Sequence, residues 1–188
     1  YNIMHRWAYV SPLWISQLML RGLHDEREGG QSLKHLSHTL SEPPYSTAIK
    51  TNRYELQWKN GFTLNADHNT SIALMLHGSW HDADHVFGLT QYDVTQKNGY
   101  AQLMFETDVN ENHNLSVGAS LNHDYYNERL NPLGTLPNAE NKTTHETTPG
   151  LYAQYTYKLG RQLTVMPGVR WDYSNYYGGF VTPRLHIK

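Results

Sequence analysis

The stretch GLYAQYTYKLGRQLTVMPGVRWDYSNYYGGFVTPRLHIK, residues 150–188, decides how the rest of the chain is interpreted. From residue 151 to 158 apolar or aromatic side chains alternate with mostly polar ones, and the alternation resumes over 163–173 after a short break at 159–162. Alternation with a period of two is the pattern of a β-strand with two unlike faces. A third such strand follows the turn at 176–179. The stretch therefore predicts three strands, each with an apolar face and a charged or polar face.

Aromatic residues mark both ends of the apolar face. Tyr155 and Tyr157 close one end, and Trp171 and Tyr173 close the other. Aromatic girdles at the two membrane interfaces of a transmembrane barrel have this arrangement, and about 9–11 residues are enough for a tilted strand to cross a bilayer. The alternative is a soluble antiparallel sheet with one solvated face.

The same alternation predicts about nine strands along the whole chain. The first six fall at 1–9, 13–25, 45–58, 71–81, 100–109 and 114–125. The connections between strands are short at 10–12, 110–113 and 159–162, intermediate at 59–70, and long at 26–44, 82–98 and 127–148. Leu33, Leu36 and Leu40 could form a short helix in the first long connection. Short turns alternating with longer loops are typical of outer-membrane barrels.

Composition supports a barrel wall over a soluble domain. Only 38% of the residues are hydrophobic and the mean hydropathy is -0.67, yet the chain has 14 Tyr and 5 Trp. Disorder would predict few aromatic residues. No apolar run is long enough for a transmembrane helix, cysteine is absent, and a net charge of -2 gives no basic surface for nucleic acid.

Residues 149–188 resemble a barrel segment of the TonB-dependent outer-membrane receptors, in particular the colicin, ferric-siderophore and cobalamin receptor group. Three pieces carry the resemblance: GLYAQY at 150–155, GVRWD at 168–172 and GFVTPRLH at 179–186. It implies an all-β fold, in which residues 1–188 are part of one antiparallel transmembrane β-barrel domain of 22 strands. Small inward side chains such as Ser71, Ser116 and Ser120 suit the wall of a wide polar lumen.

The ends of the chain predict an internal piece of a longer protein. Tyr1 does not begin a signal peptide, and the alternation is still running at Lys188. We therefore expect the signal peptide, and the plug domain that the resemblance implies, to lie outside this chain.

The resemblance also implies a function. The expected activity is import of a scarce ligand, such as a ferric siderophore, haem or cobalamin, across the bacterial outer membrane. The expected partners are membrane lipid, the periplasmic energy-transducing protein TonB through N-terminal parts, and the metal chelate or cobalamin, with a surface lipoprotein as a further candidate. No cofactor, no nucleic acid and no enzymatic activity are expected.

One cluster in the expected loop at 82–98 resembles a metal site. His81, Asp82, Asp84 and His85 place two imidazoles and two carboxylates within five residues, and these groups can bind a divalent ion if they converge. Phe87 and Tyr92 in the same loop are candidates for ligand contact. The alternative is a solvated extracellular loop that happens to carry these side chains.

Two further pairs sit two residues apart and so share a sheet face: Glu106 with Asp108, and Arg170 with Asp172. We interpret them as polar groups facing the lumen, since the chain has no phosphate loop, nucleophile elbow or zinc-protease motif. Three other classes remain open. They are a small stand-alone porin or structural barrel, a barrel-embedded enzyme, and a secreted soluble β-sandwich.

Overall fold

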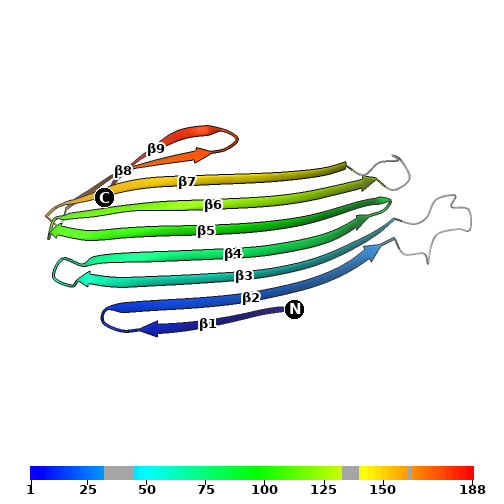
Figure 1. The fold of residues 1–188 in the computed structure, drawn as a ribbon, viewed down its shortest axis with the longest axis horizontal. Helices are drawn as coiled ribbons and strands as arrows, with labels where there is room; N and C mark the ends of the chain where they lie inside the picture. Colours follow the sequence, from blue (N-terminus) through cyan, green and yellow to red (C-terminus); the bar gives the residue numbers. More distant parts are fainter. Residues whose placement is uncertain (32–44, 133–139, 161) are drawn as a thin grey trace, which may run out of the picture.

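The computed structural model describes residues 1–31, 45–132, 140–160 and 162–188. These residues form one antiparallel sheet of nine strands in which each strand pairs with its neighbours in sequence (Figure 1). The strands are β1 Asn2–Val10, β2 Trp14–Gly30, β3 Ser46–Asn65, β4 Thr70–Phe87, β5 Thr90–Asn110, β6 His113–Pro132, β7 Glu140–Leu159, β8 Leu163–Ser174 and β9 Gly178–Ile187. The predicted all-β class and strand number are confirmed.

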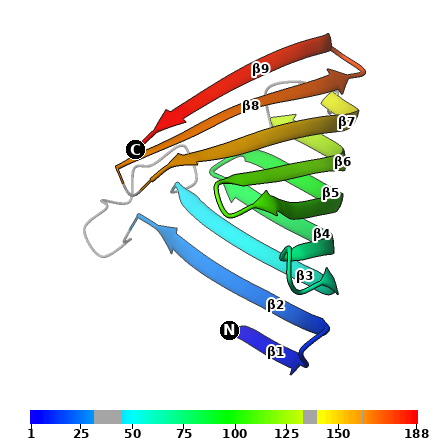
Figure 2. The ribbon, with the colours of Figure 1, turned by 90° about the vertical axis from the view of Figure 1, so that its left-hand side faces the viewer.

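The sheet is a single curved layer. Seen along the strands (Figure 2), it bends into an arc with β1 at one edge and β9 at the other. Among the described residues these two edge strands pair only with β2 and β8, so the nine strands do not close on themselves. An eight-stranded barrel closes around an interior just wide enough for its side chains, so this sheet has the shape of a segment of a larger wall.

The sheet has almost no hydrophobic core of its own. Ala83, at 1% exposure, is the only buried hydrophobic side chain among the described residues. Large apolar side chains such as Leu103, Leu151 and Leu185 are about half exposed. Because a soluble sandwich buries the inner faces of two packed sheets, the single layer does not fit the soluble β-sandwich alternative. No described helix is long and apolar enough to span a membrane.

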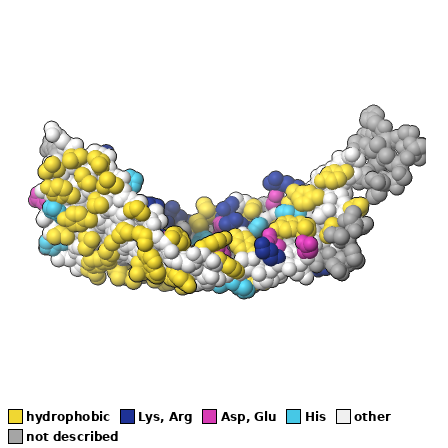
Figure 3. All heavy atoms as spheres, turned by 90° about the horizontal axis from the view of Figure 1, so that it is seen from above, with side chains coloured by type: hydrophobic (Ala, Val, Ile, Leu, Met, Phe, Trp, Pro, Cys, Tyr) yellow, Lys and Arg dark blue, Asp and Glu magenta, His cyan; other side chains and the backbone are white. Residues whose placement is uncertain are grey.

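Cross-strand pairing fixes which side chains share a face, because directly opposed residues of an antiparallel pair point the same way. Leu18 pairs with Trp58, Trp58 with Leu76, and Leu76 with Ala101. We call the face that carries these residues the outer face and the opposite one the inner face. Viewed from above (Figure 3), the layer is bowed. Hydrophobic side chains gather at the β8–β9 end and along the convex side, and Lys and Arg side chains are visible on the concave side.

The strands are longer than the alternation of apolar residues predicts. β3 has 20 residues and β5 has 21, so each is about 70 Å long at ~3.3 Å per residue. The prediction of a loop at 82–98 is wrong, because β4 runs to Phe87 and β5 begins at Thr90. A two-residue turn joins them, with Gly88 at a φ of 60°, a value that glycine adopts without strain.

Two other expected connections are also shorter in the structure. β3 continues to Asn65, well into the expected turn at 59–70. β6 runs to Pro132 and β7 begins at Glu140, so most of the expected loop at 127–148 is strand. The predicted helix at Leu33, Leu36 and Leu40 lies outside the described residues.

Candidate functional site

The outer face carries an apolar band with aromatic residues at both limits. Tyr54 and Trp80 stack at one limit with ring centroids 5.5 Å apart, and Trp14 and Phe62 stack at the other with centroids 6.0 Å apart. Tyr54 and Phe62 are eight residues apart on β3, which is about 27 Å along the strand. Counted with both limits, these are nine residues, and a tilted β-strand needs about 9–11 residues to cross a bilayer, so the band has the length of a membrane span between two aromatic girdles.

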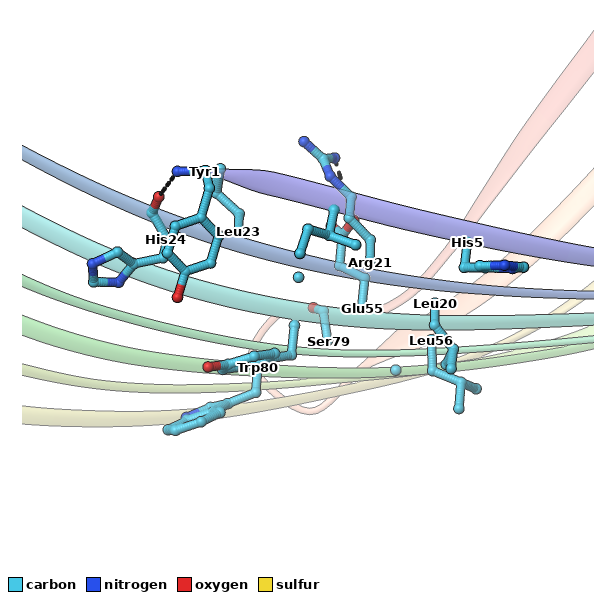
Figure 4. A pocket seen from close by; sticks show the side chains of 14 residues that line it. Tyr1, His5, Leu20, Arg21, Leu23, His24, Glu55, Leu56, Ser79 and Trp80 are labelled. Carbon is cyan, nitrogen blue, oxygen red and sulfur yellow. Dashed lines mark hydrogen bonds and ion pairs between the residues drawn. The ribbon is translucent and has the colours of Figure 1, made fainter.

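Near the Tyr54–Trp80 limit, apolar and charged side chains lie on opposite faces of the sheet. In Figure 4, Leu20, Leu56 and Trp80 point to one side of the strands and Arg21 points to the other. A groove of about 820 Å³ lies here, and Gly22 and Gly78 are among its lining residues. Most of its exposed lining is apolar, as expected for a surface that faces lipid, so this groove is not a candidate for binding a polar ligand.

Beyond the band, both faces of the extended strands are polar. The predicted site residues lie here, on β4 and β5 and not in a loop. His81, His85 and Phe87 are on the inner face of β4, and Tyr92 is on the inner face of β5 opposite His85. Asp82 and Asp84 point to the outer face, where Asp82 accepts a hydrogen bond of 2.7 Å from the Thr95 hydroxyl.

This split separates the carboxylates from the imidazoles of the suggested metal cluster. A metal site needs side chains that converge on one point, and alternate residues of a strand point to opposite faces. Throughout the described part of the chain, no group of three or more His, Cys, Asp or Glu side chains is placed to hold a metal ion.

The structure does bring three of the predicted residues together. The ring of His85 lies 5.8 Å from that of Phe87 and 6.1 Å from that of Tyr92. The Tyr92 hydroxyl donates a 2.7 Å hydrogen bond to Glu128 on β6. That hydrogen bond, with partial burial and the negative charge of Glu128, raises the pKa of Tyr92 above its ordinary value. We call His85, Phe87, Tyr92 and Glu128 the upper inner cluster.

At the depth of the apolar band, the inner face carries ion pairs. Glu55 forms ion pairs with Arg53, at an N–O distance of 2.6 Å, and with Arg21, at 3.4 Å. Arg170 contacts Asp172 through two nitrogens, Nε at 2.7 Å and Nη2 at 2.6 Å. The Asp172 side chain is only 8% exposed. The predicted inner-face pairing of Arg170 with Asp172 is confirmed.

The other predicted carboxylate pair is also on the inner face. Asn114 donates hydrogen bonds to Glu106 at 3.0 Å and to Asp108 at 2.9 Å. Both carboxylates therefore have polar partners, which agrees with the solvated face expected for them.

Sequence reasoning missed how glycines on neighbouring strands make room for long inner side chains. The Tyr152 ring lies against Gly118, where an added Cβ would be 2.4 Å from Tyr152 Cε1. Arg170 lies over Gly150 and reaches Ser120 Oγ on β6 at 2.9 Å. The small inward residues were noted in the sequence, but only the strand register identifies the side chains that cross them.

Comparison with known proteins gives one family match. A family model described as "TonB dependent receptor-like, beta-barrel" matches residues 23–188. No curated protein matches the chain.

Solved outer-membrane proteins have a similar fold. The alcaligin outer-membrane receptor FauA from Bordetella pertussis is 9% identical, with a TM-score of 0.69 over 100% of this chain and 30% of that one. The outer-membrane transporter YddB from Escherichia coli is 12% identical, with a TM-score of 0.69 over 98% of this chain and 28% of that one. The ferric yersiniabactin uptake receptor FyuA from Yersinia pestis is 14% identical, with a TM-score of 0.55 over 100% of this chain and 32% of that one. The chain thus spans about a third of the length of these structures.

Proposed function

Because this chain belongs to the TonB-dependent receptor-like β-barrel family, we propose that it forms part of the wall of a receptor that imports a scarce ligand. The ligand class is a ferric siderophore, haem or cobalamin. Energy would come from TonB, through a plug and an N-terminal segment carried by other parts of the protein. The family consists of receptors and transporters of the bacterial outer membrane, not of enzymes.

The observation that carries the proposal is an open, two-faced wall that extends beyond its apolar band. The band extends over about 27 Å of strand, whereas β5 has 21 residues and is about 70 Å long. We propose that the polar inner surface of this extra length, including the upper inner cluster, lies outside the membrane. A ligand could be held there before it passes through the barrel.

The openness of the sheet supports a large barrel over a small porin. Nine strands curve without β1 meeting β9, whereas 22-stranded transporters enclose a lumen wide enough for a plug. The fold likeness to FauA and FyuA, whose names refer to alcaligin and ferric yersiniabactin, supports a metal chelate as the first ligand to test.

The test is uptake by the full-length protein in a Gram-negative host that lacks its own receptors for the probes. Radiolabelled ferric hydroxamate and phenolate chelates, haem and cobalamin would each be supplied to cells with and without functional TonB. We expect one probe to accumulate only when TonB is present. Equal accumulation without TonB would indicate a passive pore, and no accumulation of any probe would refute import of these ligand classes.

A further inference from the structure

Two polar residues interrupt the apolar band on the outer face. Ser16 on β2 and Asn60 on β3 are direct cross-strand partners, and Asn60 shares the outer face with Trp58 because the two are separated by two residues. Asn60 is only 6% exposed. It lies two residues from Phe62, or about 6.6 Å along the strand. The two polar residues therefore lie just inside the Trp14–Phe62 limit of the band.

Two indole groups fix how these polar side chains are oriented. The indole nitrogen of Trp14 donates to Asn60 Oδ1 at 3.4 Å, and that of Trp58 donates to Ser16 Oγ at 3.1 Å. An indole N–H can only donate a hydrogen bond, so the oxygen of the Asn60 amide faces Trp14. The amide nitrogen is left for a different partner.

The donors that remain have no acceptor in the described part of the chain. Asn60 Nδ2 is buried and forms no hydrogen bond with any described residue. The Ser16 hydroxyl accepts from Trp58 and donates to none of these residues. A buried donor without an acceptor is costly, and the hydrocarbon of a bilayer holds no water to supply one. The pair therefore favours an acceptor from a molecule outside the sheet.

The open edges of the sheet do not explain the missing acceptor. Asn60 lies on β3, which pairs with β2 and β4, and β2 in turn pairs with β1. A further strand would continue the sheet beyond β1 or β9 and would leave the outer face of β3 uncovered. The acceptor must therefore come from what contacts the outer face, and on an outer-membrane barrel this is lipid.

The surroundings favour a neutral acceptor at the depth of a lipid ester. The outward side chains of β2, β3 and β4 between the two aromatic limits are all uncharged, whereas a phosphate favours a cation. Aromatic girdles lie at the level of the headgroups, and a strand tilt of about 35–45° places Asn60 about 5 Å inside the Phe62 level. In a glycerophospholipid, the carbonyls between the headgroup and the acyl chains are those of the glycerol esters.

We infer that Asn60 and Ser16 form a hydrogen-bonding site for an ester carbonyl of a glycerophospholipid, in the leaflet next to the Trp14–Phe62 limit. Trp14 and Trp58 beside the site are 39% and 40% exposed. The carbonyl reaches the Asn60 amide when one of these rings changes rotamer, a motion that exposed side chains make within nanoseconds. The inference goes beyond the import function and needs only an outer face that contacts lipid, so the two can fail independently.

The test is equilibrium binding of single lipids to the purified full-length protein in a non-ionic detergent, measured by native mass spectrometry. The probes are dipalmitoyl phosphatidylcholine and its dihexadecyl diether analogue, which has the same headgroup and chain length but no ester carbonyl. We expect the first bound lipid to favour the diester by about three- to tenfold in the wild type. Asn60→Leu should abolish most of this preference, and Ser16→Ala should reduce it by about twofold.

Asn52→Leu is the matched control. Asn52 is on the same strand and face, but it lies beyond the Tyr54 limit, where its Oδ1 is 2.7 Å from His24 Nδ1. This variant should keep the wild-type preference for the diester. Equal binding of the two lipids by the wild type would overturn the inference, as would an equal loss of preference in the two asparagine variants. A dimer in the same spectra without a diester preference would assign the amide to a contact between two copies and would also overturn it.

Discussion

Gly150 on β7 and Asp172 on β8 are direct cross-strand partners, and a Cβ at Gly150 would lie 2.2 Å from Asp172 Oδ1. The same atom would lie 2.6 Å from Arg170 Nη2. The absence of a side chain at residue 150 is thus what allows the guanidinium and the carboxylate to meet over β7.

Replacing Gly150 with alanine should therefore disturb the pair. We expect Gly150→Ala to lower the free energy of unfolding by about 1–3 kcal/mol, the usual cost of overpacking a filled site. The measurement is urea unfolding of the full-length protein in detergent or lipid. Gly61→Ala is the control, because a Cβ added at Gly61 would have no other atom within 4 Å. If both variants unfold at the same urea concentration, the close approach is not a constraint.

Because it is more buried, the Arg170–Asp172 pair should contribute more to the free energy of unfolding than a similar exposed pair. Asp25 and Arg27 also lie on the inner face, with an Nε–Oδ2 distance of 2.7 Å, but their side chains are 35% and 74% exposed. Arg170→Met leaves a buried carboxylate without its cation and should cost about 2–4 kcal/mol. Arg27→Met should cost less than about 1 kcal/mol. A double-mutant cycle with Asp172→Asn and Asp25→Asn measures each coupling, and equal couplings would contradict this ranking.

Tyr92 should ionise at a higher pH than an ordinary tyrosine. Its hydrogen bond to Glu128 stabilises the neutral phenol and raises its pKa. The stabilisation is fully present below the unfolded-state pKa of about 10 and is lost as the pH rises through the higher folded-state value. The pair therefore adds no pH dependence to stability between about pH 6 and 8.

The measurement for Tyr92 is the alkaline titration of phenolate absorbance, taken as the difference between the wild type and Tyr92→Phe. The same difference is then taken between Glu128→Gln and the double variant Glu128→Gln/Tyr92→Phe. We expect its midpoint at a lower pH, because Glu128→Gln removes the negative charge and the carboxylate acceptor. An unchanged midpoint in Glu128→Gln would contradict the assigned cause.

An added positive charge should destabilise the outer face of β4 more than the inner face. Leu74 lies on the outer face opposite Asn60 and Leu103, and its neighbour Met75 lies on the inner face opposite Lys59 and Gln102. Leu74→Arg should lower stability in lipid by about 2–4 kcal/mol, the cost of a cation facing the bilayer midplane. Met75→Arg should cost less than about 1 kcal/mol, because its face is polar. Unfolding in phospholipid bilayers compares them, and a larger cost at Met75 would reverse our assignment of the faces.

The sequence determined the faces of the sheet wherever one side contacts lipid. Trp171 and Val169 alternate with Arg170 and Asp172 because lipid requires apolar side chains on one face only, and the strand period of two turns that requirement into a readable pattern. The strand number, the aromatic limits and the inner-face ion pair of Arg170 with Asp172 all followed from it.

Only the tertiary structure decided how far the strands continue and which residues meet. Beyond the band neither face contacts lipid, so His81–Phe87 and Thr90–Gly99 carry no alternation of apolar residues and resemble a loop in sequence. Both segments are nevertheless strand, because the neighbouring strands supply backbone hydrogen-bond partners along the whole length of β4 and β5. The contacts of Tyr92 with Glu128 and of Arg170 with Ser120 depend on a register between segments 36 and 50 residues apart, which no local pattern encodes.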